Sequence, residues 1–305
     1  MFTKLTFHQQ FDLIKKQVND LLKKHIRCIK VIDSDLINTI QYVVFGGKRI
    51  RSFFVYSIGN MLDVSHNQMS RIAASVECIH VYSLIHDDLP SMDNDDIRRG
   101  EKSCHVVFGE ANAILAGNAL QSLAFEILLD LNGKTIDHEN HLQIIRELAI
   151  ASGINGICMG QSLDISENNA GKMNIKALNA IYYYKTVSLI KAAIRMSFYA
   201  SQYQHEKNLI HILDDFSKNV GLLFQLSDDL IDLEKDQSNL QKSKKITYPI
   251  LVGLNESKEF GHRLYKEAMR KIYLVEERYG FNVDMLYNIT KFIFQWKNEF
   301  QYKLE

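Results

Sequence analysis

The chain has 305 residues, of which 46% are hydrophobic and 24% charged, with 36 Lys and Arg balanced by 36 Asp and Glu. A chain of this length and apolar content can bury a large core, which excludes overall disorder. The balanced charge excludes a global basic field of the kind that gathers nucleic acid, so any anion binding must come from local clusters.

The cysteines and apolar segments indicate a reducing compartment and no stable insertion into a membrane. The four cysteines lie far apart and form no Cys-x-x-Cys pair, which argues against a structural zinc site or a disulfide framework. The N-terminal residues contain no apolar run of signal-peptide length, and no later stretch reaches the ~18 uninterrupted apolar residues of a spanning helix. We therefore expect a cytoplasmic protein.

Helical periodicity dominates the chain. The sequence contains two prolines, Pro90 and Pro249, and alternating strand-like patterns bounded by turn residues are scarce. Apolar residues at three- and four-residue spacing predict core helices. These predicted helices cover residues 71–86, 113–131, 175–199, 209–233 and 285–300.

Polar and turn-rich segments separate the predicted helices. The expected loops are residues 63–68, 132–140, 166–174, 236–245 and 280–284. None is long enough to serve as an interdomain linker, and no tandem repeat or low-complexity tract interrupts the pattern. We therefore expect one all-α domain that spans residues 1–305.

Residues 46–51 read GGKRIR, which places three cations behind two glycines. Glycines allow close approach of the backbone and a turn into a following helix. Arginine suits bidentate contact with phosphate oxygens, and lysine supplies a point charge. A basic run of this kind is commonly a solvated surface, so its interpretation depends on the other clusters.

Residues 86–100 read HDDLPSMDNDDIRRG and crowd five aspartates into ten positions. Pro90 disfavours helical geometry at Leu89, so the preceding helix should end or bend near Asp88. On an unbroken helix, at ~100° per residue, Asp87 and Asp93 would lie about 240° apart, so the proline is what allows them to converge. An all-carboxylate cluster suits Mg²⁺, although a solvated loop is the alternative.

A second acidic cluster, FQLSDDLID, lies about 140 residues after the first and also begins with Asp-Asp. Asp228 and Asp232 share one helix face, where two like charges destabilise a bare helix. Two such clusters on apolar helices together favour metal binding over solvation. Two further basic groups could hold a diphosphate beside the metal: Arg98-Arg99, directly after the first cluster, and Lys185-Thr186.

Taken together, these segments resemble the trans-polyprenyl diphosphate synthases, particularly the bacterial farnesyl diphosphate synthases. The DDxxxxD and DDxxD motifs occur with both arginine motifs, which makes the resemblance specific. The matching segments occur in the family's order between about residues 41 and 254: GGKRIR, ECIHVYSLIHDDLPSMDNDDIRRG, CHVVFGEANAILAGNAL, GQSLD, YKT, FQLSDDLID and KKITYP.

The resemblance implies an isoprenoid-synthase bundle of long antiparallel helices around a central cavity, usually a homodimer, with the two aspartate motifs facing each other across its mouth. It also implies a cluster of two to three Mg²⁺ ions. The implied metal ligands are Asp87, Asp88, Asp93, Asp228 and Asp232. Catalysis would rest on Asp87, Asp93, Asp228 and Lys185.

The same resemblance implies two diphosphate sites. Isopentenyl diphosphate would be held by Lys48, Arg51, His80 and Arg99. The allylic diphosphate would be held by Arg98, Lys185, Thr186, Gln225, Lys242 and Lys245. Without the resemblance, His80 would be interpreted as a satisfied core histidine.

Two further pairs acquire roles only through the resemblance. Gln161 and Asp164 are similar to a pair that orients ligands, although their i,i+3 spacing also suits a bond between the two side chains. A bulky aromatic residue shortly before the first aspartates limits product length in the family. Tyr82, with Ser83 beside it, therefore favours a C15 product, and packing in the core is the alternative for Tyr82.

The implied reaction joins dimethylallyl or geranyl diphosphate to isopentenyl diphosphate and gives farnesyl diphosphate and diphosphate. Cations neutralise the departing diphosphate, the allylic C–O bond ionises, and the double bond of isopentenyl diphosphate attacks the resulting cation. The released diphosphate takes the final proton, so no side-chain base is required.

Three alternatives stay open: a geranylgeranyl diphosphate synthase, a terpene cyclase of the same fold, and a non-catalytic synthase subunit. GGKRIR and Arg98-Arg99 disfavour a cyclase, because a cyclase needs no second diphosphate site. The complete aspartate motifs disfavour a non-catalytic subunit. Sequence alone leaves product length and the preferred allylic starter open.

Several positions depart from the family pattern. Ser52 replaces the usual proline, Asn94 replaces an aspartate, and Ser227 replaces a glutamine. The segment 233–245 is shorter than in relatives and lacks a GKxxxxD segment, which puts the roles of Lys242 and Lys245 in doubt. Trp296-Lys297 stands where relatives often have a more basic tail, so closure of the site is expected to be weaker.

Overall fold

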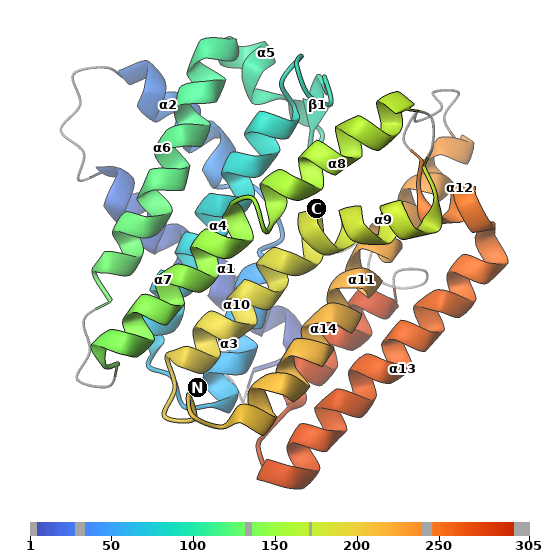
Figure 1. Ribbon diagram of the computed structural model, residues 1–305. Coiled ribbons are helices and arrows are strands. Elements are labelled where there is room, and N and C mark those ends of the chain that lie inside the picture. The colour runs from blue at the N-terminus through green and yellow to red at the C-terminus, as the bar shows by residue number, and fades with distance from the viewer. Residues whose placement is uncertain (1–4, 28–33, 132–135, 171–172, 239–245, 296–305) are drawn as a thin grey trace. The chain divides into compact units, whose positions relative to one another are not determined.

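The structure is a computed structural model that describes residues 5–27, 34–131, 136–170, 173–238 and 246–295 (Figure 1). Within these ranges the chain is helical apart from turns and one two-stranded hairpin, which confirms the all-α fold class. The chain divides into two compact units, one of residues 1–149 and 196–205, the other of residues 150–195 and 206–305. A single domain over residues 1–305 stays a prediction.

The first unit is built around α4 (His66–Asp87), which packs against α6 (Glu110–Leu129), α3 (Ile50–Met61) and α1 (Phe7–Arg27). The rings of Phe53, Phe54 and Tyr56 on α3 are fully buried, and each contributes on the order of 1.5–3 kcal/mol of hydrophobic free energy. The unit also contains α2 (Ser34–Val44), α5 (Cys104–Phe108), most of α7 (His138–Ser152) and the end of α10 (Ser188–Tyr199).

A glycine lets α6 approach the end of α4 that carries the first aspartate motif. A Cβ at Gly117 would lie 2.2 Å from Nε2 of His86, so a side chain there would displace the His86 ring from its present position. Among the described helices, α6 alone is long and apolar enough to cross a membrane. Here it packs against α4 and α2.

The hairpin follows the first aspartate cluster. Strands β1 (Ile97–Arg98) and β2 (Glu101–Lys102) are antiparallel, with Ile97 opposite Lys102 and Arg98 opposite Glu101. Arg99 and Gly100 form the turn and both have positive φ, at 57° and 82°. The hairpin therefore carries Arg98 and Arg99 back toward the end of α4.

The second unit is built around the long helix α11 (Lys207–Ser238), which packs against α13 (Leu254–Tyr279) and α14 (Asp284–Phe294). Helices α8 (Ile157–Ala170) and α9 (Ile175–Tyr182) lie beside a π-helix, η2 (Tyr183–Val187). Pro249 lies in the first turn of α12 (Tyr248–Val252), where its missing N–H costs no hydrogen bond.

Helical periodicity located the core helices but misplaced several ends. Residues 66–68, expected as loop, begin α4, because Ser65 and Gln68 form a capping box. The segment 166–174 is helical as far as Ala170, and 236–238 continue α11. The segment 175–199 is interrupted by η2, and α14 ends at Phe294. Residues 239–245 and 296–305 lie outside the described residues.

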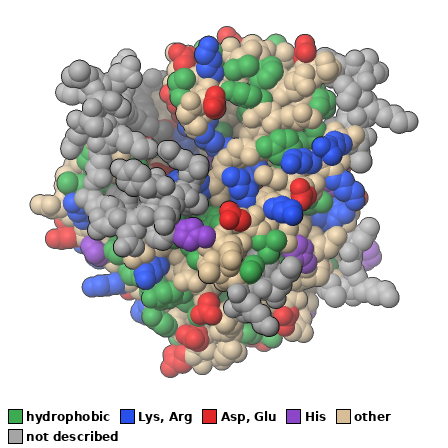
Figure 2. Space-filling view, turned by 180° about the vertical axis from the view of Figure 1, so that it is seen from behind, with side chains coloured by type: hydrophobic (Ala, Val, Ile, Leu, Met, Phe, Trp, Pro, Cys, Tyr) green, Lys and Arg blue, Asp and Glu red, His purple; other side chains and the backbone are tan. Residues whose placement is uncertain are grey.

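Basic and acidic side chains are interspersed on the face shown in Figure 2, in keeping with the balanced charge of the sequence.

Candidate active site

The first aspartate motif lies where α4 ends. The helix stops at Asp87, and the next residue, Asp88, caps it, as Pro90 predicted. The chain then folds back, and the N–H of Asp93 donates to the carbonyl oxygen of Asp87 at 2.8 Å. Asn94 accommodates this return with a φ of 54°, which asparagine tolerates. Asp87 and Asp93 are thus neighbours in the backbone, the convergence that the proline allows.

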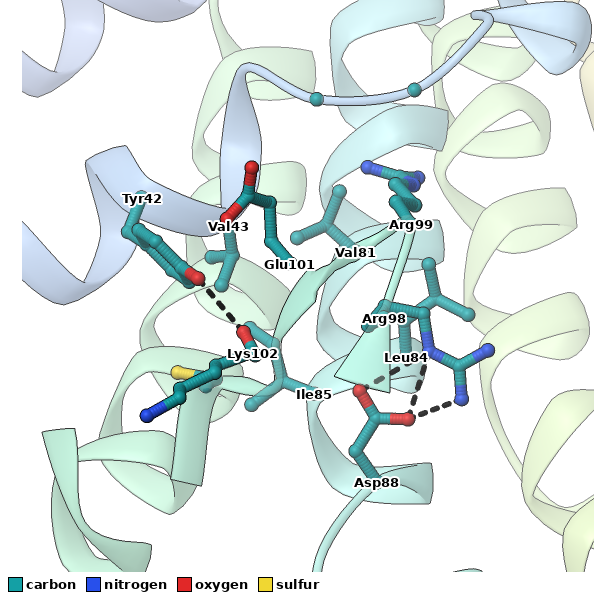
Figure 3. Close-up of a pocket in the computed structure, with 13 residues that line it drawn as sticks. Tyr42, Val43, Val81, Leu84, Ile85, Asp88, Arg98, Arg99, Glu101 and Lys102 are labelled. Atoms are coloured by element: carbon teal, nitrogen blue, oxygen red, sulfur yellow. Dashed lines mark hydrogen bonds and ion pairs between the residues drawn. The ribbon is translucent and has the colours of Figure 1, made fainter. Parts of the chain in front are cut away.

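Asp88 is 2% exposed and forms an ion pair with Arg98 of the hairpin (Figure 3). Nε of Arg98 lies 2.9 Å from Oδ1 and 3.2 Å from Oδ2 of Asp88, and Nη2 also donates to Oδ1. Burial raises the pKa of Asp88, and Arg98 offsets this only in part. Asp88, which the sequence predicts to support the metal ions, and Arg98, which it predicts to bind the allylic diphosphate, therefore contact each other.

Arg99 lies against the two glycines of GGKRIR. A Cβ at Gly47 would lie 2.7 Å from Cζ of Arg99, and one at Gly46 would lie 3.0 Å from its Nη1. Gly47 also has a φ of 94°, which disfavours any side chain. The glycine pair therefore leaves room for the guanidinium of Arg99. This contact brings GGKRIR and Arg98-Arg99, two basic segments far apart in the sequence, next to each other.

A cavity of about 250 Å³ opens at this junction (Figure 3). It combines cations and carboxylates with an apolar wall from α4. The lining residues are Tyr42, Val43, Gly46, Gly47, Val81, Leu84, Ile85, Asp88, Arg98, Arg99, Glu101, Lys102 and Cys104.

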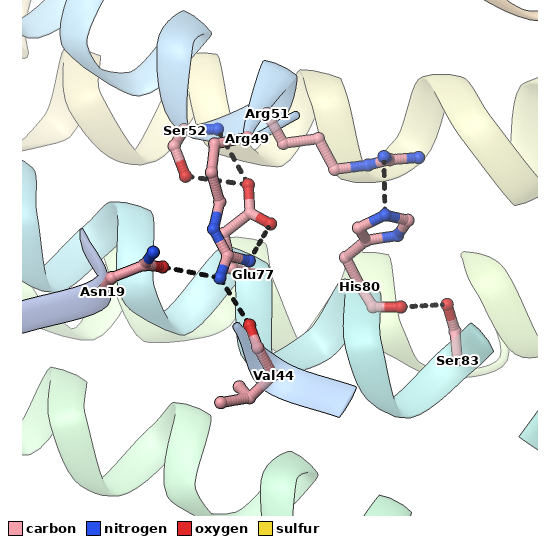
Figure 4. A network of polar contacts seen from close by, with 8 residues as sticks. All are labelled: Asn19, Val44, Arg49, Arg51, Ser52, Glu77, His80 and Ser83. Carbon is pink, nitrogen blue, oxygen red and sulfur yellow. Dashed lines mark hydrogen bonds and ion pairs between the residues drawn. The ribbon is translucent and has the colours of Figure 1, made fainter. Parts of the chain in front are cut away.

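His80 faces Arg51, with 3.3 Å between Nε2 of His80 and Nη1 of Arg51 (Figure 4). Burial, followed by the charges of Arg51 and Arg99, holds the pKa of His80 well below its ordinary value of 6.5. The ring is therefore neutral at pH 7. Since arginine only donates, Nε2 accepts from Arg51 and the ring proton lies on Nδ1. Of the predicted isopentenyl diphosphate ligands, Arg51, His80 and Arg99 interact, and Lys48 lies exposed on the same segment.

The second unit presents Lys185 and Thr186 from the π-helix. Nζ of Lys185 donates to Oδ2 of Asp164 at 2.8 Å, and Oγ1 of Thr186 donates to Oε1 of Gln225 at 2.7 Å. A Cβ at Gly160 would lie 2.6 Å from the backbone nitrogen of Lys185, so this glycine allows α8 to approach η2 closely. Single-turn π-helices occur frequently at functional sites. Three of the predicted allylic ligands thus lie together.

The second aspartate motif lies on α11. Asp228 and Asp232 are exposed, whereas Asp229 is 6% exposed. Oδ1 of Asp229 accepts from Nε2 of Gln225 at 3.1 Å, and Oδ2 accepts from the hydroxyl of Tyr182 and from the N–H of Tyr248 at 3.3 Å. Asp229 therefore anchors the start of α12. The sequence-based prediction missed this role, although the i,i+4 spacing of Gln225 and Asp229 indicates their bond.

The remaining predicted site residues are Tyr82 and Ser83 on α4, and Lys242 and Lys245. Tyr82 is buried, and its ring meets that of His86 edge to face at 5.6 Å between centroids. The hydroxyl of Ser83 donates to the carbonyl oxygen of His80 at 2.9 Å. Lys242 and Lys245 lie outside the described residues. The roles of Tyr82 and Ser83 in product length stay predictions.

The donor set at the end of α4 fits Mg²⁺. Among the described side chains, no three His, Cys, Asp or Glu groups are gathered closely enough to hold a metal by themselves. Mg²⁺ is usually bound by one or two carboxylates, with waters and substrate phosphates as its other ligands. Asp87 and Asp93 supply carboxylate oxygens of this kind.

Comparison with known proteins gives consistent matches. Residues 33–279 match the polyprenyl synthetase family. The farnesyl diphosphate synthase of Escherichia coli K12 is 41% identical over 283 residues, which cover 90% of this chain and 94% of that protein. The solved geranyltransferase of Legionella pneumophila is 34% identical, with a TM-score of 0.85 over 96% of this chain and 98% of that one.

A geranyltransferase of Helicobacter pylori, solved in complex with magnesium and isoprenyl diphosphate, is 27% identical. The match has a TM-score of 0.79 and covers 93% of this chain and 97% of that one. The similarity thus extends over nearly the whole length of both chains.

Proposed function

The chain belongs to the polyprenyl synthetase family, and on that premise we propose that it is a prenyltransferase that makes farnesyl diphosphate. The substrates are dimethylallyl or geranyl diphosphate and isopentenyl diphosphate. The observation that carries the proposal is the contact between Arg51 of α3 and His80 of α4, near enough to Arg99 of the hairpin for its charge to lower the pKa of His80. The 41% identity to a farnesyl diphosphate synthase supports the C15 product.

Asp87, Asp93 and Asp228, supported by Asp88 and Asp232, are the proposed ligands of two to three Mg²⁺ ions. When bound, Mg²⁺ neutralises charge on the departing diphosphate. The relative from Helicobacter pylori, which was solved with magnesium and isoprenyl diphosphate, supports this use of the metal.

The allylic diphosphate is proposed to bind Arg98, Lys185, Thr186 and Gln225. Nζ of Lys185, now on Asp164, supplies a point charge, and Thr186 supplies a hydroxyl that Gln225 orients. Lys242 and Lys245 remain predicted ligands of the same group.

Isopentenyl diphosphate is proposed to bind Lys48, Arg51, Arg99 and neutral His80. Because Nε2 of His80 accepts from Arg51, its Nδ1–H is the donor for a phosphate oxygen. The cations balance the diphosphate charge, and the neutral ring adds a donor without another buried charge.

The chemical step breaks the allylic C–O bond, and the electron pair leaves with the diphosphate. The double bond of isopentenyl diphosphate then supplies the electrons of the new C–C bond, which leaves a cation on that unit. The released diphosphate takes a proton from the carbon beside this cation, and the electrons of the broken C–H bond form the double bond of the product. The residues of the site orient the two reactants and stabilise the leaving charge. No side-chain base is needed.

Incubation of the purified protein with Mg²⁺, geranyl diphosphate and isopentenyl diphosphate tests the proposal, with products identified by mass spectrometry. Farnesyl diphosphate is expected. A C20 diphosphate supports geranylgeranyl diphosphate synthesis, a hydrocarbon or cyclic alcohol supports a cyclase, and the absence of any product supports a non-catalytic subunit.

Tyr82 is proposed to limit the product length. Its buried ring lies on α4, five residues before Asp87. Replacement Tyr82→Ala should lengthen the products beyond C15, because it removes the ring that stops the growing chain. Product analysis by mass spectrometry measures this change, and an unchanged C15 profile would count against the assignment.

The protein is also proposed to be a cytoplasmic homodimer. Val106 and Val107 on α5, and Ile114 and Leu115 on α6, are exposed large apolar residues on two helices that pack together. Such a patch suits burial against a second copy. Light scattering should show a dimer that Leu115→Glu weakens, whereas Leu142→Glu, a control at a position 67% exposed on α7, should leave it intact.

A further inference from the structure

Arg49 of the GGKRIR segment forms a buried ion pair with Glu77 of α4 (Figure 4). Nη1 of Arg49 lies 3.0 Å from Oε2 of Glu77, and the side chains are 0% and 2% exposed. Arg49 has a φ of 58° and caps the N-terminus of α3. Its Nη2 donates to Oδ1 of Asn19 at 2.8 Å, and to the carbonyl oxygen of Val44, the last residue of α2. One guanidinium thus joins α1, α2 and α4 to the start of α3.

The other oxygen of Glu77 holds the first turn of α3. Oε1 accepts from the N–H of Ser52 at 3.2 Å and from the hydroxyl of Ser52 at 2.8 Å. Glu77 therefore contacts the residues on both sides of Arg51 at the start of α3, Arg49 before it and Ser52 after it.

The same carboxylate lies one turn from a proposed ligand. His80 follows Glu77 by three residues on α4, so the two side chains emerge from adjacent turns. Arg51, held between Arg49 and Ser52, contacts His80 at 3.3 Å. The network therefore holds the first turn of α3, and with it the position of Arg51 beside His80.

The negative charge of Glu77 is stabilised by the arginines and by Ser52 around it. Burial alone would raise its pKa, but the charge of Arg49 and the bonds from Ser52 and Arg49 hold the pKa below its ordinary value of 4.5. Glu77 is therefore ionised at pH 7. Its charge also opposes the lowering of the pKa of Arg99 that burial causes. It is a buried counter-charge for the arginines proposed to bind the second diphosphate.

From these contacts, and resting on the proposed function, we infer that Glu77 is a positioning residue for isopentenyl diphosphate. Through Arg49 and Ser52 it holds α3 so that Arg51 meets His80 in the geometry that the diphosphate requires. It does so without touching the substrate. Its loss should therefore weaken binding of this substrate selectively.

The test compares Glu77→Gln and Ser52→Ala in steady-state kinetics with both substrates varied. Ser52→Ala removes one bond to Glu77 and leaves the buried ion pair in place. We expect KM for isopentenyl diphosphate to rise on the order of ten-fold in Glu77→Gln and roughly three-fold in Ser52→Ala. KM for geranyl diphosphate and kcat should change by less than about two-fold.

Ser57→Ala is the matched control. Its hydroxyl is also buried on α3 and donates to the carbonyl oxygen of Phe53 at 2.8 Å, away from Glu77. It should leave both KM values unchanged. If Ser52→Ala changes neither KM, or changes both equally, the inference is wrong. Circular dichroism shows whether Glu77→Gln folds, and Ser52→Ala decides the question if it does not.

Calorimetric binding of isopentenyl diphosphate separates this inference from the proposed function. A wild-type protein that makes no prenyl product would contradict the proposed function. The inference would still stand if Glu77→Gln and Ser52→Ala bind isopentenyl diphosphate more weakly by the same factors. An active wild type whose variants bind this substrate normally would overturn the inference alone.

Discussion

The second residue of each Asp-Asp pair is buried and held by the protein, but the two are held by different chemistry. Asp88 of the first pair accepts from a guanidinium, that of Arg98, whose side chain is 34% exposed. Asp229 of the second pair accepts from neutral donors, the hydroxyl of Tyr182, the amide of Gln225 and the N–H of Tyr248. In each pair the first aspartate, Asp87 or Asp228, is the more exposed.

The difference in exposure indicates that the two aspartates of each Asp-Asp pair have different roles. The more exposed aspartate of each pair can serve a ligand, and the buried one fixes the local backbone. Asp88 is held by Arg98, which is itself a proposed substrate ligand. Asp229 is tied to the start of α12, which has no proposed role in chemistry.

The largest effect is expected from the more exposed aspartates. Asp87→Ala and Asp228→Ala should each lower kcat at least about a thousand-fold, because charge on the leaving diphosphate is no longer balanced. Thermal unfolding should be nearly unchanged, since neither side chain is buried. Asp12→Ala, at an exposed position on α1, is the control. Retained activity in both variants would refute their proposed role.

The buried aspartates should differ in stability. Asp229→Asn replaces an acceptor among buried neutral donors and should lower the free energy of unfolding by about 3 kcal/mol. Asp88→Asn should cost about 1–2 kcal/mol, since Arg98 is partly exposed and also donates to Asp95. Urea unfolding at pH 7 measures both. A larger loss for Asp88→Asn would contradict the distinction between the two anchors.

A single hydroxyl can be removed from the Asp229 anchor. Tyr182→Phe removes the hydroxyl that donates to Asp229. The same hydroxyl accepts from the N–H of Tyr248 at 3.1 Å. The free energy of unfolding should fall by about 1–1.5 kcal/mol. Tyr273→Phe is the control, because that residue is 54% exposed, and it should change the stability by less than about 0.5 kcal/mol. Equal losses in the two variants would show that the hydroxyl of Tyr182 is not an anchor.

The smallest effect concerns acid sensitivity in the first unit. The folded protein holds the pKa of His80 well below 6.5, whereas in the unfolded chain it lies near 6.5. As the pH falls below 6.5, the unfolded chain takes a proton that the folded site refuses, so stability is lost. From pH 6.5 to 5.5 the wild type should lose about 0.5–1 kcal/mol more than His80→Gln. Parallel curves in urea unfolding would contradict the neutral state of His80.

Helix positions could be predicted from the sequence because apolar spacing reports burial on one face. The segments 113–131 and 209–233 correspond to α6 and α11 within a few residues. Helix ends were harder to predict, because caps and turns are short polar signals. The pair Ser65 and Gln68 was such a signal, and it starts α4 inside a segment expected to be loop.

The site was predictable as far as local pattern determines geometry. Pro90 predicted the break after Asp87, and GGKRIR predicted a close approach, which Arg99 makes. The buried ion pair of Arg49 could not be predicted, because in the sequence Arg49 is one more cation beside Lys48 and Arg51. Its partner Glu77 lies on another helix, and such pairing depends on tertiary packing.

The π-helix Tyr183–Val187 makes the number of residues in this segment of the second unit important. A π turn contains one residue more than the α turn it replaces, so it turns the residues that follow by ~100° relative to an uninterrupted helix. Lys185 and Thr186 lie within this turn, where they reach Asp164 and Gln225. Deleting one residue here could restore a regular helix and still lose both contacts. The spacing of residues in this segment therefore matters as much as their identity, because a one-residue deletion would separate Lys185 and Thr186 from Asp164 and Gln225 even if all four residues were kept.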